Sequence, residues 1–430
     1  MPGDKGRVVV SAARKTGAVS ILAGAVLALS VSAAAQDFGL RFGPVGEGTS
    51  PGAPGYDRSF IREWQANPPK GFPTVSKDNL APTKAAVARY KQIVDNGGFV
   101  AVPEGEMERG LTHVAVGLLR QRLLASGELR EETSTPNFFN GDLETAVKRF
   151  QASNGLAPTG IVDKRTIAAL NVPADVRLKQ LKSNLSRLAG LSKIVGAKRY
   201  VLVNIPAAQI EVVEGNAVVS RHSGVVGKPD RPTPLLRSSI SELHFNPMWT
   251  LPPTVIKEDL IPKGQDMQKS GASVLEKYGI DAYEGGKKLK PGSIDWNSSR
   301  PRHLTYRQAP GKDNPLGFLK INFANSSSVY MHDSPKESIF GRNFRAASSG
   351  CVRVQSIEKL AAWLLRGQSG WSEAQIESIK ESGKKKNVRV RRPVPLYFVY
   401  VTAWATEDGV VQFRPDIYQK DGVGEIAAAY

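Results

Sequence analysis

The hydrophobic pattern changes its period near Tyr200, and this change limits the chain to a fold with separate helical and sheet regions. From Asn79 to about Arg130, and again over residues 139–171, apolar residues recur at the spacing of an amphipathic helix. From Tyr200 onward apolar and polar residues alternate, as they do in half-buried strands. We therefore expect an α+β chain in which the helices come first.

Three strand pairs are predicted in the second half of the chain. A hairpin over residues 199–227 turns at 214–216, residues 318–323 pair with 329–332, and residues 394–404 pair with 410–414. Between residues 253 and 305 the alternation lapses into a Pro-, Gly- and Lys-rich stretch with short helical pieces. This stretch predicts an inserted lobe of the kind that covers a cleft.

The N-terminal segment predicts export. Four basic residues among the first fifteen precede an apolar run over 18–31, and the small residues at 33–35 suit a signal peptidase. We interpret 1–35 as a signal peptide; an uncleaved membrane anchor and an organelle-targeting peptide are the alternatives. A flexible linker is predicted over 36–78, because residues 39–55 contain nine Gly or Pro. No later segment approaches the roughly 20 apolar residues of a spanning helix, so we expect a periplasmic or cell-envelope protein without a transmembrane span after signal removal.

The chain contains a single cysteine, Cys351. Exported proteins usually pair their cysteines, and one cysteine cannot pair within its own chain. A buried structural thiol is one interpretation; an activated nucleophile is the other, favoured because an unpaired thiol is a liability in an oxidising compartment. The net charge of +18 favours anionic partners, and export argues against nucleic acid. The basic run over 384–392 is interpreted as a solvated face rather than a binding site.

A cysteine nucleophile needs a base and donors for the oxyanion. His332 lies 19 residues before Cys351, and the other histidines are alternatives. Gly350 permits a tight turn before the cysteine. A helix is expected to begin near Ile357, which would favour the thiolate at Cys351 and turn the Gly350 and Cys351 amides toward an oxyanion.

Residues 139–171 resemble the peptidoglycan-binding domain found in many wall hydrolases. The stretch reads AVKRFQASNGLAPTGIVDKRTIAAL at its centre, with Gly155 stopping one helix and Asp163 capping the next. We place this all-α domain at 110–172 and a helical scaffold at 79–109. A helical bundle that merely fills its own core is the alternative, and no ligand residue can be named.

The stretch HDSPKESIFGRNFRAASSGCVRV, residues 332–354, resembles the active-site signature of the L,D-transpeptidases with a YkuD-type catalytic domain. Further stretches, including FNPMWTLPPTV and the inserted lobe, are similar to the YcbB-like branch. The resemblance implies a mainly β catalytic domain over 198–420 with the lobe at 253–305.

The resemblance also implies roles for individual residues. Cys351 would be the nucleophile and His332 the base, with the backbone carbonyl of Asp333 orienting the imidazole. Arg353 would hold a substrate carboxylate, or else form a structural ion pair. Ser348 matches the serine of the motif. Ser349 stands where many members have a histidine, which leaves an accessory role for a second imidazole in doubt.

The implied activity is peptidoglycan L,D-transpeptidation without a cofactor or metal. Stem peptides would be the donors, and a second stem or an envelope protein would accept the acyl group; carbapenems would acylate the cysteine. An L,D-carboxypeptidase and a non-catalytic wall-binding scaffold are the alternatives. Ser356 and Lys359 fit the SxxK pattern of D,D-transpeptidases, but the companion KTG occurs only at 15–17, within the export signal.

Overall fold

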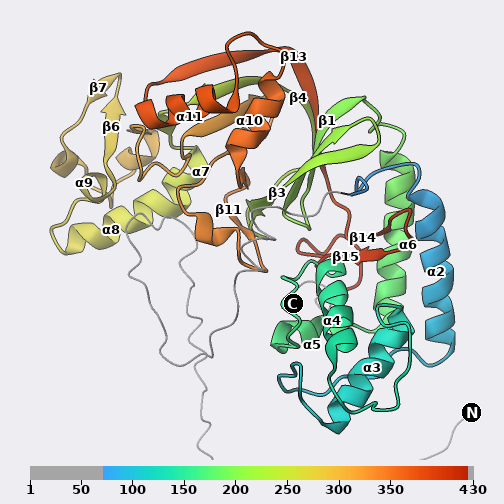
Figure 1. Cartoon of the computed structure of the whole chain (residues 1–430). Coiled ribbons are helices and arrows are strands. Elements are labelled where there is room, and N and C mark those ends of the chain that lie inside the picture. Colours follow the sequence, from blue (N-terminus) through green and yellow to red (C-terminus); the bar gives the residue numbers. More distant parts are fainter. Residues whose placement is uncertain (1–70, 425–430) are drawn as a thin grey trace, which may run out of the picture. The chain divides into compact units, whose positions relative to one another are not determined.

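The computed structural model describes residues 71–424. The predicted signal peptide and linker residues 36–70 lie outside the described residues. Within the described part, no helix is both long enough and apolar enough to cross a membrane. The element order confirms the predicted α+β class, because helices α2 to α6 precede the strands of a large sheet (Figure 1).

The early helices begin and end where local capping predicts. Their bounds are α2 Leu80–Asp95, α3 Val114–Ser126, α4 Gly141–Ser153, α5 Lys164–Leu170 and α6 Ala174–Leu191. Asp163 accepts a hydrogen bond from the Thr166 amide at 2.8 Å and so caps α5. Helix α4 ends two residues before Gly155, whose φ of +74° suits a residue without a Cβ. Both the predicted cap and the predicted stop are confirmed.

Helices α3, α4 and α5 share one apolar core. It includes Val116, Leu119, Leu123, Leu143, Val147, Phe150, Ile167 and Leu170. Helices α2 and α6 pack instead against a two-stranded sheet formed by β14 (Ala403–Ala405) and β15 (Val411–Phe413). The end of the chain therefore contributes to the core of the first helices, an arrangement that the local pattern did not predict.

A nine-stranded sheet dominates the rest of the chain. Its strands are β1 Arg199–Asn204, β2 Gln209–Glu214, β3 Ala217–Gly227, β4 Leu236–Phe245, β9 Leu319–Phe323, β10 Met331–His332, β11 Ala346–Ser348, β12 Val352–Val354 and β13 Lys386–Val399. The order is β11-β3-β12-β10-β9-β4-β13-β1-β2, and β2 pairs with β3 as well, so the sheet closes on itself. The predicted β2–β3 hairpin and β9–β10 pair are confirmed.

The third predicted strand pair is wrong in its first half. Residues 394–399 belong to β13, which pairs in parallel with β1 and antiparallel with β4. The segment that pairs across the 407–409 turn is the short β14 alone. Helices α10 (Ile357–Leu365) and α11 (Glu373–Ser382) pack their apolar side chains into the core of this sheet.

The inserted lobe has a core of its own. It contains α7 Pro253–Val255, the π-helical turn η1 Ile256–Leu260, α8 Ile261–Lys269, α9 Val274–Tyr278 and a small sheet of β5 Trp249–Thr250, β6 Ile280–Glu284, β7 Lys287–Lys288 and β8 Thr305–Gln308. Trp249, Trp296 and Tyr306 are among its buried side chains. In Figure 1 the lobe is the yellow region that carries α8 and α9.

Candidate active site

Strand register brings four side chains to one face of the sheet. Strands β10 and β12 are parallel, with Met331 beside Val352 and His332 beside Arg353. Met331 and Val352 are fully buried in the sheet core. Because successive strand side chains point to opposite faces, the remaining side chains lie together on the other face. They are Tyr330, His332, Cys351 and Arg353.

The loop that carries Cys351 is held by hydrogen bonds on both sides. Gly350 has a φ of +107°, a conformation that favours glycine. The Ser348 hydroxyl donates to the Cys351 carbonyl at 2.6 Å and accepts the Gly350 amide at 3.2 Å. The Thr233 hydroxyl donates to the Gly350 carbonyl at 2.9 Å. The Gly350 amide, predicted to face an oxyanion, therefore has Ser348 as its partner in this structure.

The predicted helix begins at Ile357, but strand β12 lies between it and the cysteine. The charges that act on the Cys351 thiol come instead from Lys320 on β9 and from Arg353, two residues farther along the chain on β12. Burial raises the pKa of the thiol above its usual value, while hydrogen bonds from Tyr330 and those two positive charges oppose the rise. The resting side chain is therefore a neutral thiol.

His332 is buried and oriented by the main chain. Its Nδ1 lies 2.6 Å from the carbonyl oxygen of Asp333, so Nδ1–H donates there, and the carbonyl of Pro315 also acts on the ring as a hydrogen-bond acceptor. In the neutral imidazole with Nδ1 protonated, Nε2 carries the lone pair. Burial, and then the positive charge of Arg353, lower the pKa of His332 to about 3. The imidazole is therefore neutral, as a proton acceptor must be.

The other predicted site residues have distinct surroundings. Within residues 71–424, Arg353 makes no ion pair with a carboxylate, and its Nε has no hydrogen-bond partner. Ser348 is buried and its hydroxyl serves the Cys351 loop. The Ser349 hydroxyl accepts a hydrogen bond from Arg231 at 3.1 Å, and Arg231 also pairs with Asp259 of the lobe at 2.8 Å. The hydroxyls of Ser348 and Ser349 therefore both form hydrogen bonds with other parts of the protein.

Three further residues around the candidate site were not identified from the sequence. Tyr330 approaches Cys351, Lys320 lies beside His332 in the β9–β10 register, and Trp249 donates to the Tyr330 hydroxyl at 3.3 Å. Tyr330 stands two residues before His332, so strand alternation alone could have placed it on the same face. Trp249 could not have been found in that way, because it enters from another sheet.

The remaining candidates have structural surroundings. His222 is buried, with Nδ1 2.9 Å from the Gln355 carbonyl, and His244 pairs with Glu242 at 2.7 Å. Within the described chain, no group of three His, Cys, Asp or Glu side chains is placed to hold a metal ion.

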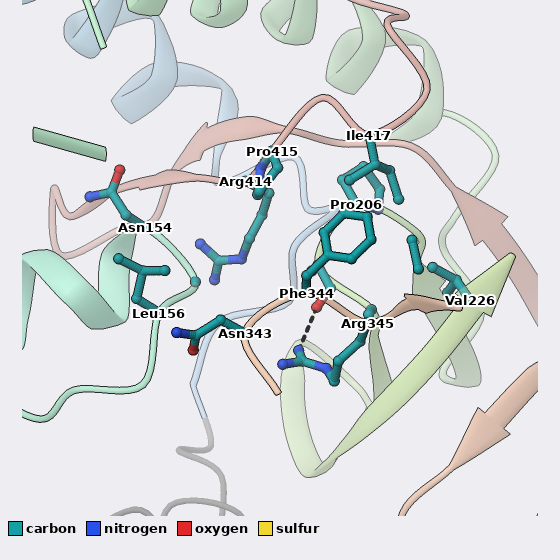
Figure 2. A pocket seen from close by; sticks show the side chains of 14 residues that line it. Asn154, Leu156, Pro206, Val226, Asn343, Phe344, Arg345, Arg414, Pro415 and Ile417 are labelled. Carbon is teal, nitrogen blue, oxygen red and sulfur yellow. Dashed lines mark hydrogen bonds between the residues drawn. The ribbon is translucent and has the colours of Figure 1, made fainter. Parts of the chain in front are cut away.

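A small pocket shown in Figure 2 lies away from the cysteine. It is lined by the end of α4, segment 343–346 and segment 414–417, and includes neither Cys351 nor His332. Arg345 in its wall donates to the carbonyls of Ala207 and Gly224 at 3.0 and 3.1 Å. Because this guanidinium already has carbonyl partners, the pocket offers no reason to move the candidate site.

The two buried histidines predict a loss of stability in acid. Burial lowers the pKa of His222 to about 4, and His332 has a pKa of about 3. An unfolded histidine has a pKa of about 6.5, so below that pH the unfolded chain binds protons that the folded chain does not. The unfolding free energy should fall by about 2 kcal/mol per histidine between about pH 7.5 and about pH 5.

Urea unfolding at these two pH values measures the effect. The His222→Gln variant should lose about half of the pH dependence, because one of the two buried neutral imidazoles has been removed. Equal pH dependence in the wild type and His222→Gln would contradict a neutral buried His222.

Comparison with known proteins agrees with both resemblances. Residues 198–379 match the family described as "L,D-transpeptidase catalytic domain" (YkuD), and residues 112–170 match the family described as "Putative peptidoglycan binding domain". The chain therefore carries an L,D-transpeptidase catalytic domain preceded by a peptidoglycan-binding domain.

A curated relative from Haemophilus influenzae, named "Putative L,D-transpeptidase", is 34% identical over 223 residues. The match covers 51% of this chain and 44% of that relative, so this chain spans less than half the length of the relative it matches. Among solved structures, an L,D-transpeptidase from Mycobacterium smegmatis is 16% identical, with 47% of this chain and 59% of that chain covered and a TM-score of 0.24. One from Xylanimonas cellulosilytica is 14% identical, with 69% and 98% covered and a TM-score of 0.22.

Proposed function

We propose that the chain is a peptidoglycan L,D-transpeptidase that works through a cysteine acyl-enzyme. The observation that carries this proposal is the shared face of His332 on β10 and Cys351, the residue directly before β12. The domain matches support peptidoglycan as the substrate and a cell-wall or periplasmic location. Export would depend on residues 1–35, and no cofactor is needed for the proposed chemistry.

In the first half-reaction, Cys351 attacks the L,D amide of a donor stem peptide. The resting thiol is neutral, so its proton must leave as the C–S bond forms, and Nε2 of His332 is the proposed acceptor. The imidazolium then protonates the departing D-amino acid, which leaves a thioester on Cys351. The carbonyl of Asp333 keeps Nδ1–H engaged throughout, so that Nε2 is the nitrogen with a lone pair to accept the proton.

In the second half-reaction, an amine attacks the thioester and releases the thiol. The acceptor is the diamino acid of a second stem or an amine of an envelope protein. The same intermediate attacked by water gives an L,D-carboxypeptidase. Both reactions use the same acyl-enzyme, so the residues around Cys351 do not distinguish them.

Two further roles are proposed for neighbouring residues. Arg353 would bind a substrate carboxylate, because its buried guanidinium lacks an anionic partner within the described chain. Gly350 would donate its amide to the oxyanion. For that second role, the hydrogen bond that the Gly350 amide now donates to the Ser348 hydroxyl must break.

Defined tetrapeptide muropeptides test the proposal directly. Products of the purified chain are identified by mass spectrometry. A cross-linked dimer with loss of one D-amino acid supports transpeptidation, and a tripeptide product without a dimer identifies a carboxypeptidase. The absence of both products would leave the wall-binding scaffold as the better interpretation.

The helical domain over 110–172 is proposed to retain the enzyme on the cell wall. A variant lacking these residues should be retained several-fold less on intact sacculi, with little change in turnover of soluble muropeptides. Arg414 donates to the Ser153 carbonyl at 2.8 Å, and Asn343 accepts the Ala157 amide at 3.1 Å, so the deletion removes contacts with the rest of the chain. Circular dichroism must therefore show that the variant is folded, and equal retention of a folded variant would contradict the wall-binding role.

A further inference from the structure

Tyr330 lies directly beside Cys351 in the parallel strand pair. The Tyr330 carbonyl accepts the Val352 amide at 3.0 Å, which fixes the two chains side by side at this point. The main-chain amide and the phenolic hydroxyl of Tyr330 both favour the thiolate and so oppose the rise in the pKa of Cys351 that burial causes. The ring also packs against His332, with 5.6 Å between the ring centroids. Tyr330 therefore contacts both groups of the proposed dyad.

The direction of the hydrogen bond to the sulfur follows from a neighbour. Trp249 Nε1 donates to the Tyr330 hydroxyl oxygen at 3.3 Å. An indole N–H can only donate, so the phenolic oxygen accepts from Trp249. The proton of the hydroxyl then remains for the sulfur. The three groups form a chain in which Trp249 donates to Tyr330 and Tyr330 donates to Cys351.

Trp249 is held in a fixed position by its burial in the lobe. Its side chain is 5% exposed and belongs to the core of the inserted lobe, against which Tyr330 also packs. Lys320 lies on the Tyr330 ring, with its Nζ 4.2 Å from the centroid. The phenol is thus held by packing on the lobe side and by a cation from strand β9.

The charged neighbours are compatible with a protonated phenol. Lys320 on β9 and Arg353 on β12 act on the thiol, both also act on His332 on β10, and Glu242 on β4 acts on Lys320. Burial raises the pKa of Tyr330 well above its usual value. The hydroxyl therefore keeps its proton at any pH at which the enzyme would work.

We propose that Tyr330 donates its phenolic hydrogen bond to the Cys351 sulfur and stabilises the thiolate, and that Trp249 is the positioning residue that orients this donor. The inference rests on the proposed function in one respect, that Cys351 is the nucleophile. It also gives the inserted lobe a part in the reaction, because Trp249 of the lobe orients the Tyr330 hydroxyl that donates to the Cys351 sulfur. A displaced lobe would leave the thiol less acidic.

Alkylation of the full chain measures this effect without any peptidoglycan substrate. Cys351 is the only thiol in the sequence, so iodoacetamide reports on it alone. The rate constant plotted against pH gives the pKa of the thiol. A charge-assisted hydrogen bond commonly changes such an equilibrium by about tenfold or more. Tyr330→Phe should therefore raise the thiol pKa by about one unit.

Two further variants complete the test. Trp249→Phe should give a smaller shift in the same direction, because the phenol remains but loses its fixed orientation. Tyr306→Phe is the matched control, since it removes a lobe hydroxyl that donates to the Pro301 carbonyl at 3.1 Å and should leave the profile unchanged. An unchanged profile in folded Tyr330→Phe overturns the proposal. If that variant does not fold, an unchanged profile in Trp249→Phe overturns it.

The outcome can be separated from that of the proposed function. A shifted profile in a chain that makes no muropeptide product would support the Tyr330 contact and reject the transpeptidase assignment. An unchanged profile in an enzyme that makes muropeptide products would reject the Tyr330 contact and support the transpeptidase assignment.

Discussion

Replacing Cys351 with alanine should abolish product formation from tetrapeptide muropeptides. The proposed reaction passes through a thioester on this sulfur, and the sequence contains no second thiol that could substitute. The loss should be at least about 10³-fold, since removal of a covalent nucleophile eliminates the acyl-enzyme path entirely. Mass spectrometry of the products measures it.

The fold should survive this substitution. Cys351 is a free, partly buried residue packed against the sheet core, and the hydrogen bonds that hold its loop come from the Ser348 and Thr233 hydroxyls to main-chain atoms. We expect a change in unfolding free energy of about 1 kcal/mol, measured by urea unfolding. Wild-type turnover by folded Cys351→Ala would reject the mechanism.

Trapping the acyl-enzyme provides an independent control on the nucleophile. A carbapenem such as meropenem presents a strained carbonyl to the attacking group and should form a thioester on Cys351 that peptide mapping locates. The rival SxxK serine, Ser356, precedes α10 with a φ of +50°. An adduct on Ser356, or one that persists in Cys351→Ala, would identify a different nucleophile.

Local pattern predicted the elements better than it predicted their partners. Alternation identified the β2–β3 hairpin and the β9–β10 pair because each joins neighbours in the sequence. The same alternation assigned residues 394–399 to a hairpin, although they pair with β1 and β4. Alternation with a period of two indicates which face of a strand is buried, but it does not indicate which strand lies alongside. It therefore could not predict a pairing between strands nearly two hundred residues apart.

The candidate site was predictable to the same extent. Cys351 and His332 could be named because they stand in a short, recognisable stretch, and the resemblance of that stretch to a known signature also implied the contact between His332 and the Asp333 carbonyl. The hydrogen-bond partners of the loop could not be named, so the engagement of the Gly350 amide by Ser348 was missed. Trp249 was missed for a physical reason too, since it reaches the site only through the packing of the lobe.

Replacing His332 with glutamine should lower the rate of acyl transfer by about 10²- to 10⁴-fold, the usual contribution of a general base. Glutamine retains a polar side chain but cannot accept the thiol proton as the C–S bond forms. His244→Gln is the matched control, because His244 pairs with Glu242 and should not contribute. Loss of activity in His244→Gln together with full activity in His332→Gln would mean that the wrong histidine has been assigned.

The pH dependence of the wild type gives this assignment a sharper test. A base with a pKa of about 3 stays neutral in acid, so kcat/KM should not show a loss near pH 6.5 in the folded enzyme. The charge of Arg353 is the second cause of this low pKa, after burial.

A substrate carboxylate bound to Arg353 would offset that charge and raise the pKa of His332 in the complex, which also makes it a stronger base. The acid limb of kcat should therefore lie at higher pH than that of kcat/KM, because kcat reports the complex and kcat/KM the free enzyme. Steady-state kinetics above the pH of unfolding measures both limbs, and coincident limbs would reject the pairing of Arg353 with a substrate carboxylate.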